Sequence, residues 1–321
     1  MDKTKNTMSC KNALKSFAIY IVFVIIVIVL AILTKGRFLK WNNILNVLRQ
    51  VSVKGIIAMG MTLILITGGI DLSVGSVLAL AGVIATDLAH PDPFHSLLLI
   101  ILVALLVGAA CGLINGCIIA FVKAPAFIVT MGMMTAARGA TMIYSAGHPI
   151  VGLSDQFLFI GQGYLFGIPT PVYFFIVVTV ISLIILNKTK LGRYIYAIGG
   201  SEDAANASGI DIVKIKIFVY TYCSLLCGLA GIILASRTNA AATTAGEGYE
   251  LDAIAGAVVG GTSTAGGKGG IYGTIIGVIL LGILTNGLDL LNVSSYIQQI
   301  VKGVIIVGAV CLDAVASKKQ A

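Results

Sequence analysis

The stretch Ile70-Asp71-Leu72-Ser73-Val74-Gly75 has a counterpart in the second half of the chain, Leu251-Asp252-Ala253-Ile254-Ala255-Gly256, and both lie in an almost wholly hydrophobic sequence. A second shared element follows each copy, Gly112-Leu113-Ile114-Asn115-Gly116 and then Gly282-Ile283-Leu284-Thr285-Asn286-Gly287. The pattern indicates two related halves, as in many transporters. The alternative is coincidental packing of small residues between membrane helices, because the acid and the asparagine are 44 residues apart in the first copy and 34 in the second.

The composition is that of an integral membrane protein. Hydrophobic residues make up 58% of the chain, charged residues 11%, and the mean hydropathy is +1.03, whereas a soluble domain has about 25% charged residues. A membrane span needs about 20 mostly apolar residues. On this basis we expect ten spans, at residues 17–34, 44–67, 72–89, 97–121, 126–146, 171–187, 215–236, 251–262, 271–290 and 296–312. The eighth is short and rich in glycine, so we expect it to be broken or partly re-entrant.

The distribution of Lys and Arg predicts that both termini are cytoplasmic. With the amino terminus inside, the inner segments hold thirteen of the 21 cations and the outer segments hold four, and loop cations are retained on the cytoplasmic side. A cluster at Lys35, Arg37, Lys40, Arg49 and Lys54 goes against this orientation. Since five spans separate the two copies, the halves would be inverted. The fold class we predict is therefore an all-α integral membrane protein of about ten transmembrane helices, built as two inverted repeats of five.

This topology divides the chain into five parts. The parts are a cytoplasmic basic tail at 1–16, a first half with the sixth span at 17–187, a cytoplasmic coupling loop at 188–214, the second-half spans at 215–312, and a cytoplasmic tail at 313–321. In this arrangement the net charge of +8 reflects topology, and we expect no nucleic-acid partner.

The long loop at 188–214 contains the features of a short capped helix. Ser201 is a good N-cap, Glu202 and Asp203 follow in the first turn, and Gly209 can end the helix. Ala204, Ala205 and Ala207 between them favour helix. A helix of about two turns is marginal in water on its own, so it must pack against something. It either docks on its own membrane domain or receives a cytoplasmic partner.

The sequence offers no candidate residues for an enzyme active site or a metal site. The glycine-rich stretch at 260–270 fails the phosphate-loop pattern twice, with Thr262 in place of the first glycine and Gly269 after the lysine, so we expect it to be a tight bend. The six cysteines suggest neither a disulfide framework nor a zinc site. We therefore predict a non-catalytic chain with no catalytic residue, no metal and no cofactor.

Several stretches together match a known family. They are Gly68-Gly-Ile-Asp-Leu-Ser-Val-Gly-Ser76, 191–200, 248–255, 260–263 with 266–269, and 286–288 with 293–296. From about residue 38 to the carboxyl end, the chain resembles the membrane permeases of bacterial ABC sugar importers, and within that family those for ribose. The resemblance implies a multi-pass protein of the bacterial inner membrane that works as a dimer, most simply a homodimer. It also implies an extracytoplasmic sugar-binding protein and a separate cytoplasmic ATPase subunit that uses the ATP.

The resemblance also assigns a role to the capped helix. The family's Glu-Ala-Ala…Gly coupling loop is similar to Glu202-Asp203-Ala204-Ala205 with Gly209, so the residues expected to contact the ATPase run from Ser201 through Asn206, with Gly209. Asp203 departs from the family pattern, which leaves open which acid makes the contact.

Two further groups of residues are candidates for the route of a neutral sugar. Residues that offer hydrogen bonds without net charge are expected along it, although they also join helices for structural reasons; they are Thr67, Ser73, Asn115, Asn286 and Gln298. Charges inside spans are functional candidates by default, and here they are Asp71, Arg138, Asp252 and Lys302. For Asp71 we favour capping of the third span or gating over direct sugar contact.

Two other function classes compete with a permease for ribose or for another pentose, hexose or ribose-like signalling molecule. In an ion-coupled secondary transporter, Asp71 and Asp252 would be ion ligands. A non-transporting scaffold would only recruit an ATPase. The family motifs and the cytoplasmic helix argue against the first, and the repeated halves argue against the second.

Overall fold

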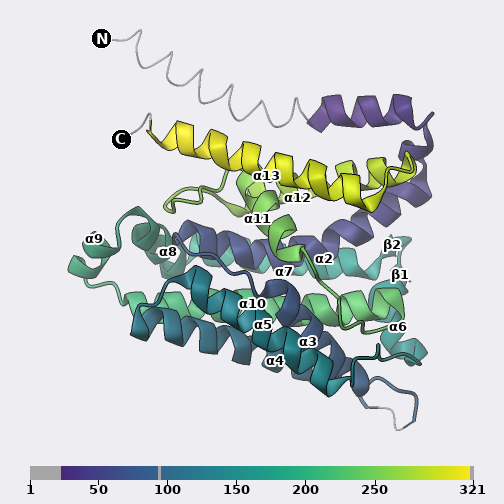
Figure 1. Cartoon of the computed structure of the whole chain (residues 1–321), viewed down its shortest axis with the longest axis horizontal. Helices are drawn as coiled ribbons and strands as arrows, with labels where there is room; N and C mark the ends of the chain where they lie inside the picture. The colour runs from purple at the N-terminus through teal and green to yellow at the C-terminus, as the bar shows by residue number, and fades with distance from the viewer. Residues whose placement is uncertain (1–22, 93–94, 319–321) are drawn as a thin grey trace.

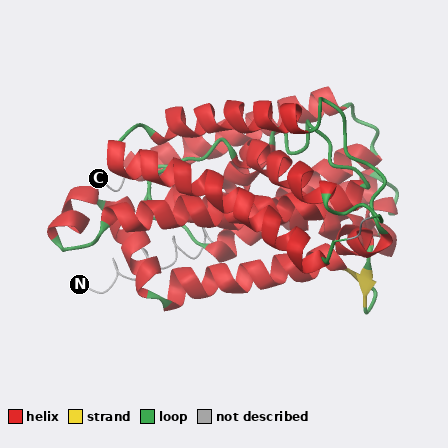
Figure 2. Cartoon of the chain, turned by 90° about the horizontal axis from the view of Figure 1, so that it is seen from below, coloured by secondary structure: helices red, strands yellow, loops and turns green. Residues whose placement is uncertain are grey.

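The computed structural model describes residues 23–92 and 95–318, which are almost entirely helical (Figures 1 and 2). After a helix at Phe23–Leu33 the elements run in order as follows: η1 (Arg37–Leu39), α2 (Trp41–Ile66), α3 (Val74–Asp87), α4 (Leu97–Cys117), η2 (Ile118–Val122), α5 (Ala126–Tyr144), α6 (Asp155–Gln162), β1 (Tyr164–Leu165), β2 (Ile168–Pro169), α7 (Thr170–Lys188), α8 (Lys190–Gly200), α9 (Glu202–Ala207), α10 (Ile212–Thr238), α11 (Tyr249–Val259), α12 (Ile271–Leu290) and α13 (Ser295–Lys318). The expected tail at 1–16 lies outside the described residues.

Six of the described helices are long and apolar enough to cross a membrane, and three shorter ones are also apolar. The six are α2, α4 with η2, α5, α7, α10 and α12, and the shorter ones are Phe23–Leu33, Val74–Asp87 and Ser295–Cys311. The chain is therefore a multi-pass membrane protein. Helix α13 continues through Lys318, so most of the expected tail at 313–321 is helical.

Among the described helices that correspond to expected spans, α3 and α11 are too short to cross a bilayer. Helix α3 has 14 residues and α11 has 11, which at 1.5 Å per residue span about 21 and 17 Å, against an apolar layer of about 30 Å. Each begins inside the bundle, α3 after a break at 67–73 and α11 after a loop at 239–248. The sequence predicted a short span only for the second of them.

The long helices α2 and α10 lie at the centre and contact each other. Helix α10 packs against α3 and α4, whereas α2 packs against α11 and α12. The outer partners follow the same scheme, because α5 contacts α3 and α13 contacts α11. Figure 1 shows α2 and α10 running side by side along the length of the molecule. Each central helix thus supports a short helix of the other half of the chain.

Helices α4 and α10 pack closely against each other through glycines. Gly108, Gly112 and Gly116 repeat every four residues along one face of α4, and the place where each Cβ would lie is already occupied by α10 backbone. Gly228 brings α10 equally close to Ala104. In an apolar solvent, helices associate by close packing of small residues, because burial of apolar surface gives no advantage over lipid.

The two ends of the bundle differ. At one end (Figure 1), α6 is followed by a two-residue antiparallel strand pair, β1 with β2, closed at Phe166-Gly167. This hairpin corrects the expectation of a purely helical chain. It forms because both turn residues adopt a left-handed backbone, with φ of +49° and +77°. Figure 2 shows it as the strand at the edge of the helical bundle.

Helices α8 and α9 lie at the opposite end, which we call the α9 end (Figure 1). There the Gly267 N–H donates to the Ile66 carbonyl at 2.9 Å, and Tyr196 Oη donates to the Gly269 carbonyl at 2.8 Å. The glycine-rich stretch turns sharply, with positive φ at Gly266 and Gly267, as expected for a bend. The sequence did not predict the eleven residues of α8.

We predict that Gly112→Ala weakens the fold by about 1–3 kcal/mol, because the added methyl group would lie 2.5 Å from the Tyr220 carbonyl oxygen on α10, and backbone cannot move aside cheaply. The measurement is the melting temperature of the purified protein in detergent. Gly308→Ala on α13 is the control, because no atom lies within 4 Å of that Cβ position. Equal melting temperatures for both variants would contradict the packing argument.

Candidate functional site

The amino-terminal ends of α3 and α11 meet inside the bundle. A Cβ on Gly246 would lie 2.6 Å from the Gly75 carbonyl oxygen, and Glu250 Oε2 lies 2.8 Å from the position of a Cβ on Gly75. A helix amino terminus carries a partial positive charge and exposes unpaired N–H groups. Acidic residues accompany both ends, Asp71 just before α3 and Glu250 with Asp252 in the first turn of α11.

Asp71 is fully buried and organises the entry into α3. Its Oδ1 accepts hydrogen bonds from the Ser73 backbone N–H at 2.8 Å and from Ser73 Oγ at 2.6 Å. Asn115 of α4 in turn donates to Ser73 Oγ at 3.1 Å. Asp71 Oδ2 and Asn115 Oδ1 are buried without a partner in the described chain. The carboxylate thus shapes the turn before α3, in the way Asx residues shape turns, and the chain of bonds ties that turn to α4.

Asp252 lies between two lysines from other helices. Its carboxylate is 2.6 Å from Lys54 Nζ of α2 and 3.1 Å from Lys302 Nζ of α13, and Lys54 also lies 5.2 Å from the centre of the Tyr249 ring. A cavity of about 400 Å³ opens beside this triad, and we call it the α13 cavity. Its lining is Lys54, Glu247, Gly248, Tyr249, Leu251, Asp252, Gln299, Lys302, Gly303 and Ile306.

Another cavity lies on the α5 side of the same helix end. It has a volume of about 500 Å³, and we call it the α5 cavity; it is lined by Ser76, Met134, Thr135, Arg138, Gly139, Glu247, Gly248 and Glu250. The Arg138 guanidinium is fixed through Nη1, which donates to the carbonyls of Thr243 and Ala245. Glu247 is exposed and Glu250 is half-buried.

The capped helix predicted from the sequence is α9. Ser201 Oγ accepts from the Ala204 N–H at 3.2 Å, and Gly209 follows the helix with a φ of +79°. Ala205 is buried, whereas Glu202, Asp203, Ala204 and Asn206 are exposed. The expectation of a short helix capped at both ends is confirmed. Ala205 is the buried residue of α9, and the other residues of the helix are exposed.

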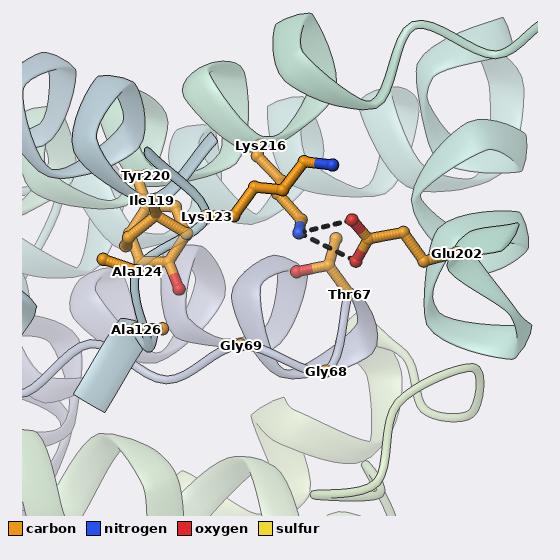
Figure 3. Close-up of a pocket in the computed structure, with 10 residues that line it drawn as sticks. All are labelled: Thr67, Gly68, Gly69, Ile119, Lys123, Ala124, Ala126, Glu202, Lys216 and Tyr220. Atoms are coloured by element: carbon orange, nitrogen blue, oxygen red, sulfur yellow. Dashed lines mark hydrogen bonds and ion pairs between the residues drawn. The ribbon is translucent and has the colours of Figure 1, made fainter. Parts of the chain in front are cut away.

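An ion pair links α9 to α10 at the α9 end. The Glu202 carboxylate is 2.8 Å from Lys216 Nζ, with the glutamate side chain 48% exposed and the lysine 19% exposed. Figure 3 shows these two side chains pointing toward each other across the mouth of a cavity of about 310 Å³, which we call the α9 cavity. The break after α2 forms its floor, and its lining is Thr67, Gly68, Gly69, Ile119, Lys123, Ala124, Ala126, Glu202, Lys216 and Tyr220.

The loop then enters α10 through a second cap. Asp211 Oδ1 accepts from the Lys214 N–H at 3.0 Å, and Oδ2 lies 2.8 Å from Lys214 Nζ. The side chain of Lys214, together with its backbone N–H, holds the pKa of Asp211 below its usual value. Both groups are exposed, so this pair sets the direction of the chain and adds little stability.

Comparison with known proteins identifies the family of this chain. The model of the family described as "Branched-chain amino acid transport system / permease component" matches residues 43–310. The chain belongs to this permease family. Its relatives include the ribose import permease of Escherichia coli strain K12, 50% identical over 287 residues and 88% of each chain. The ribose import permease of Haemophilus influenzae is 47% identical, over 92% of this chain and 91% of the relative.

A third such relative is the ribose import permease of Bacillus subtilis, 47% identical over 86% of each chain. No solved structure matches. Membership of a permease family makes this chain a transporter component rather than an enzyme.

The structure distributes the five polar residues expected along the permease route over four places. Thr67 lines the α9 cavity, and Ser73 and Asn115 belong to the Asp71 network. Asn286 exchanges two hydrogen bonds with Asn43, at 2.8 and 3.0 Å, and Gln298 donates to Asp289 and to the Val293 carbonyl. Their contact with sugar stays a prediction.

Five charged residues that the sequence argument did not select complete these sites: Lys54, Lys123, Lys216, Glu247 and Glu250. Glu250 stands inside the family stretch at 248–255, two residues before Asp252, so the charge itself was a usable signal. Lys54 was assigned to the outer part of a span, and only the fold brings it to Asp252.

We predict that Asp71→Asn permits assembly but impairs transport. The amide oxygen can still accept both hydrogen bonds from Ser73, while the charge is lost. Asp71→Ala removes the acceptor as well and should cost a further 1–3 kcal/mol, roughly, of stability. Uptake by membrane vesicles and melting temperature of the purified protein separate the two effects. Normal transport by the Asn variant would mean that the charge is not needed.

The Asp252 triad predicts an order of stability among its variants. Asp252→Asn leaves two ammonium groups without their shared counter-ion and should cost about 3–5 kcal/mol. Lys302→Met should cost much less, because Asp252 keeps Lys54 at 2.6 Å. Melting curves in detergent measure both. Equal losses in the two variants would show that the triad is not shared in this way.

Proposed function

We propose that this chain is the ribose-conducting subunit of an ABC importer, passing the sugar into the cytoplasm by alternating access. The observation that carries the proposal is the identity of 47–50% to ribose import permeases over 86–92% of the chain. Relatives named for other sugars are more distant, at 40% for allose, 36% for galactose and methyl galactoside, and 33% for xylose. The ranking favours ribose over other pentoses and hexoses.

In the proposed topology, this permease has ten spans, arranged as two inverted repeats of five. The contact scheme supports that reading, because α10 holds α3 and α4 in the way that α2 holds α11 and α12. The short helices α3 and α11 would then be corresponding elements that enter from opposite sides. Inverted repeats of this kind place the route between the halves near the midplane, where α3 and α11 meet.

The proposed orientation puts the α9 end in the cytoplasm of a bacterial cell, with both termini inside and the protein in the inner membrane. The concentration of cations at that end supports this assignment. They include Lys123 and Lys216 in the α9 cavity and Lys188, Lys190, Arg193 and Lys214 near α8 and α9.

In this arrangement the loop at 188–214 is the coupling segment, and α9 docks on a separate ATPase subunit that uses the ATP. Its exposed acids and its open surface support this role, since Ala205 is the one residue of α9 that is fully buried. Ser201 and Gly209 fix the two ends of the docking helix. The Glu202 to Lys216 ion pair connects it to α10 and the α9 cavity, so movement of the ATPase would reach the inner mouth of the route.

A second copy of the chain and an extracytoplasmic sugar-binding protein complete the proposed importer. Only a small part of α5 is buried, and Arg138 and Thr135 lie on the side with the α5 cavity. A charged group facing lipid at this depth is costly, which supports a protein partner or water over that face. In a homodimer, the second copy of the chain would cover this face of α5, and water could fill the space between the two copies.

The experiment that tests the proposed function is uptake of labelled ribose by proteoliposomes that contain this chain, its ATPase and its binding protein, with and without internal ATP. We expect uptake that requires ATP, with xylose, galactose and arabinose as weak competitors. The Glu202→Ala/Asp203→Ala double variant should lose uptake at least tenfold, because α9 loses both exposed acids. Asp155→Ala, an exposed acid at the opposite end of the bundle, is the matched control.

Each outcome separates a distinct alternative. Uptake of another sugar would keep the mechanism and change the substrate. Uptake by this chain alone, driven by an ion gradient, would replace the importer with a secondary transporter. ATPase activity stimulated by ribose without any sugar movement would indicate a scaffold.

A further inference from the structure

The α5 and α13 cavities flank the same helix end but differ in how their charges are satisfied. Both include Glu247 and Gly248 at the start of α11. In the α13 cavity, Asp252 is shared by two ammonium groups. In the α5 cavity, neither Glu247 nor Glu250 takes part in an ion pair with any described residue. In the α13 cavity, the charge of Asp252 is therefore paired within the protein. In the α5 cavity, the carboxylates of Glu247 and Glu250 remain able to accept hydrogen bonds from a ligand.

The α5 cavity offers both donors and acceptors around one space. Arg138 uses Nη1 for two backbone carbonyls, which leaves Nε and Nη2 as donors. The carboxylates of Glu247 and Glu250 are acceptors, and the Ser76 hydroxyl can act as either donor or acceptor. The Thr135 hydroxyl donates to the Met131 carbonyl at 3.1 Å and can still accept. These side chains come from α3, α5 and the start of α11. Such a mixture suits a small neutral polyol, whose hydroxyl groups both donate and accept.

The size of the cavity and the rigidity of its walls suit the same ligand. Its volume of about 500 Å³ lies in the range of small-molecule sites, about 300–1,000 Å³. Arg138 is held by backbone, and Glu250 is held where α3 and α11 cross, with Oε2 against Gly75. Charged hydrogen bonds to a sugar hydroxyl are stronger than neutral ones, so two fixed charged groups can orient a sugar without a deep pocket.

We propose that the α5 cavity is the site where the sugar rests within the membrane, with Glu250 and Arg138 as its principal contacts, and that the α13 cavity is not part of the route. This inference rests on the proposed function, because it takes the ligand to be the imported monosaccharide. It assigns Lys54, Asp252 and Lys302 to holding α11 in place.

The test is saturation-transfer NMR with ribose at millimolar concentration and the complex of permease and ATPase in nanodiscs, without the binding protein. Signal should pass from the wild-type complex to the ribose protons. Glu250→Gln has nearly the same shape and should reduce that signal at least tenfold, and Arg138→Gln should do the same. Gln299→Ala in the α13 cavity is the control, and its signal should stay within twofold of wild type.

Uptake of ribose by the same preparations, with binding protein and ATP added, distinguishes failure of this inference from failure of the proposed function. If the wild-type importer takes up ribose and Glu250→Gln gives an undiminished NMR signal, the proposed site is wrong. Wild-type uptake with a signal lost in Gln299→Ala and kept in Glu250→Gln would move the site to the α13 cavity. No ribose uptake by the wild-type importer would refute the proposed function itself. Gel filtration of each complex verifies that the variants are folded.

Discussion

The contact on which the rest of the structure depends is the meeting of two helix amino termini inside an apolar layer, made possible by Gly75 and Gly246. In a bilayer, backbone that is not helical must find its hydrogen bonds within the protein or beside water. The breaks before α3 and α11 meet this demand with side chains. Asp71 accepts from the Ser73 N–H in the first break, and Arg138 donates to the Thr243 and Ala245 carbonyls in the second. Polar chemistry at the centre of the molecule follows from that arrangement.

The long helices provide the frame that makes the meeting possible. Because α2 and α10 each support the short helix of the other half, a tilt of one half against the other changes the crossing of α3 and α11 directly. The glycine face of α4 binds α10 tightly, so α3, α4 and α10 form one rigid unit. Helix α9 is attached to that unit through the Glu202 to Lys216 pair on α10, so the proposed docking of an ATPase on α9 would act on it directly.

The sequence alone predicted the elements that depend on local signals. Apolar runs located most spans, and a serine cap with two acids and a glycine located α9, because caps and hydropathy act within a few residues. It missed α8 and the β1–β2 hairpin, and it placed the break before α3 correctly but made that span, 72–89, longer than the 14 residues of α3. It also missed the partners of the charges: Lys54 is 198 residues from Asp252, and nothing local indicates that pairing. Asn286 and Gln298 were chosen by residue type, and only the fold shows their bonds to Asn43 and Asp289.

We infer that the charged contact between the amino-terminal ends of α3 and α11 faces a water-filled route and not lipid. The most direct measurement is the labelling rate of the Thr135→Cys variant by a charged, membrane-impermeant thiol reagent, in the complex of permease and ATPase in nanodiscs. Ile181→Cys on α7, 45% exposed on an apolar helix, is the reference for lipid. We expect labelling at Thr135→Cys to be at least tenfold faster than at Ile181→Cys, and to be slowed by ribose. Equally slow labelling at both positions would contradict it.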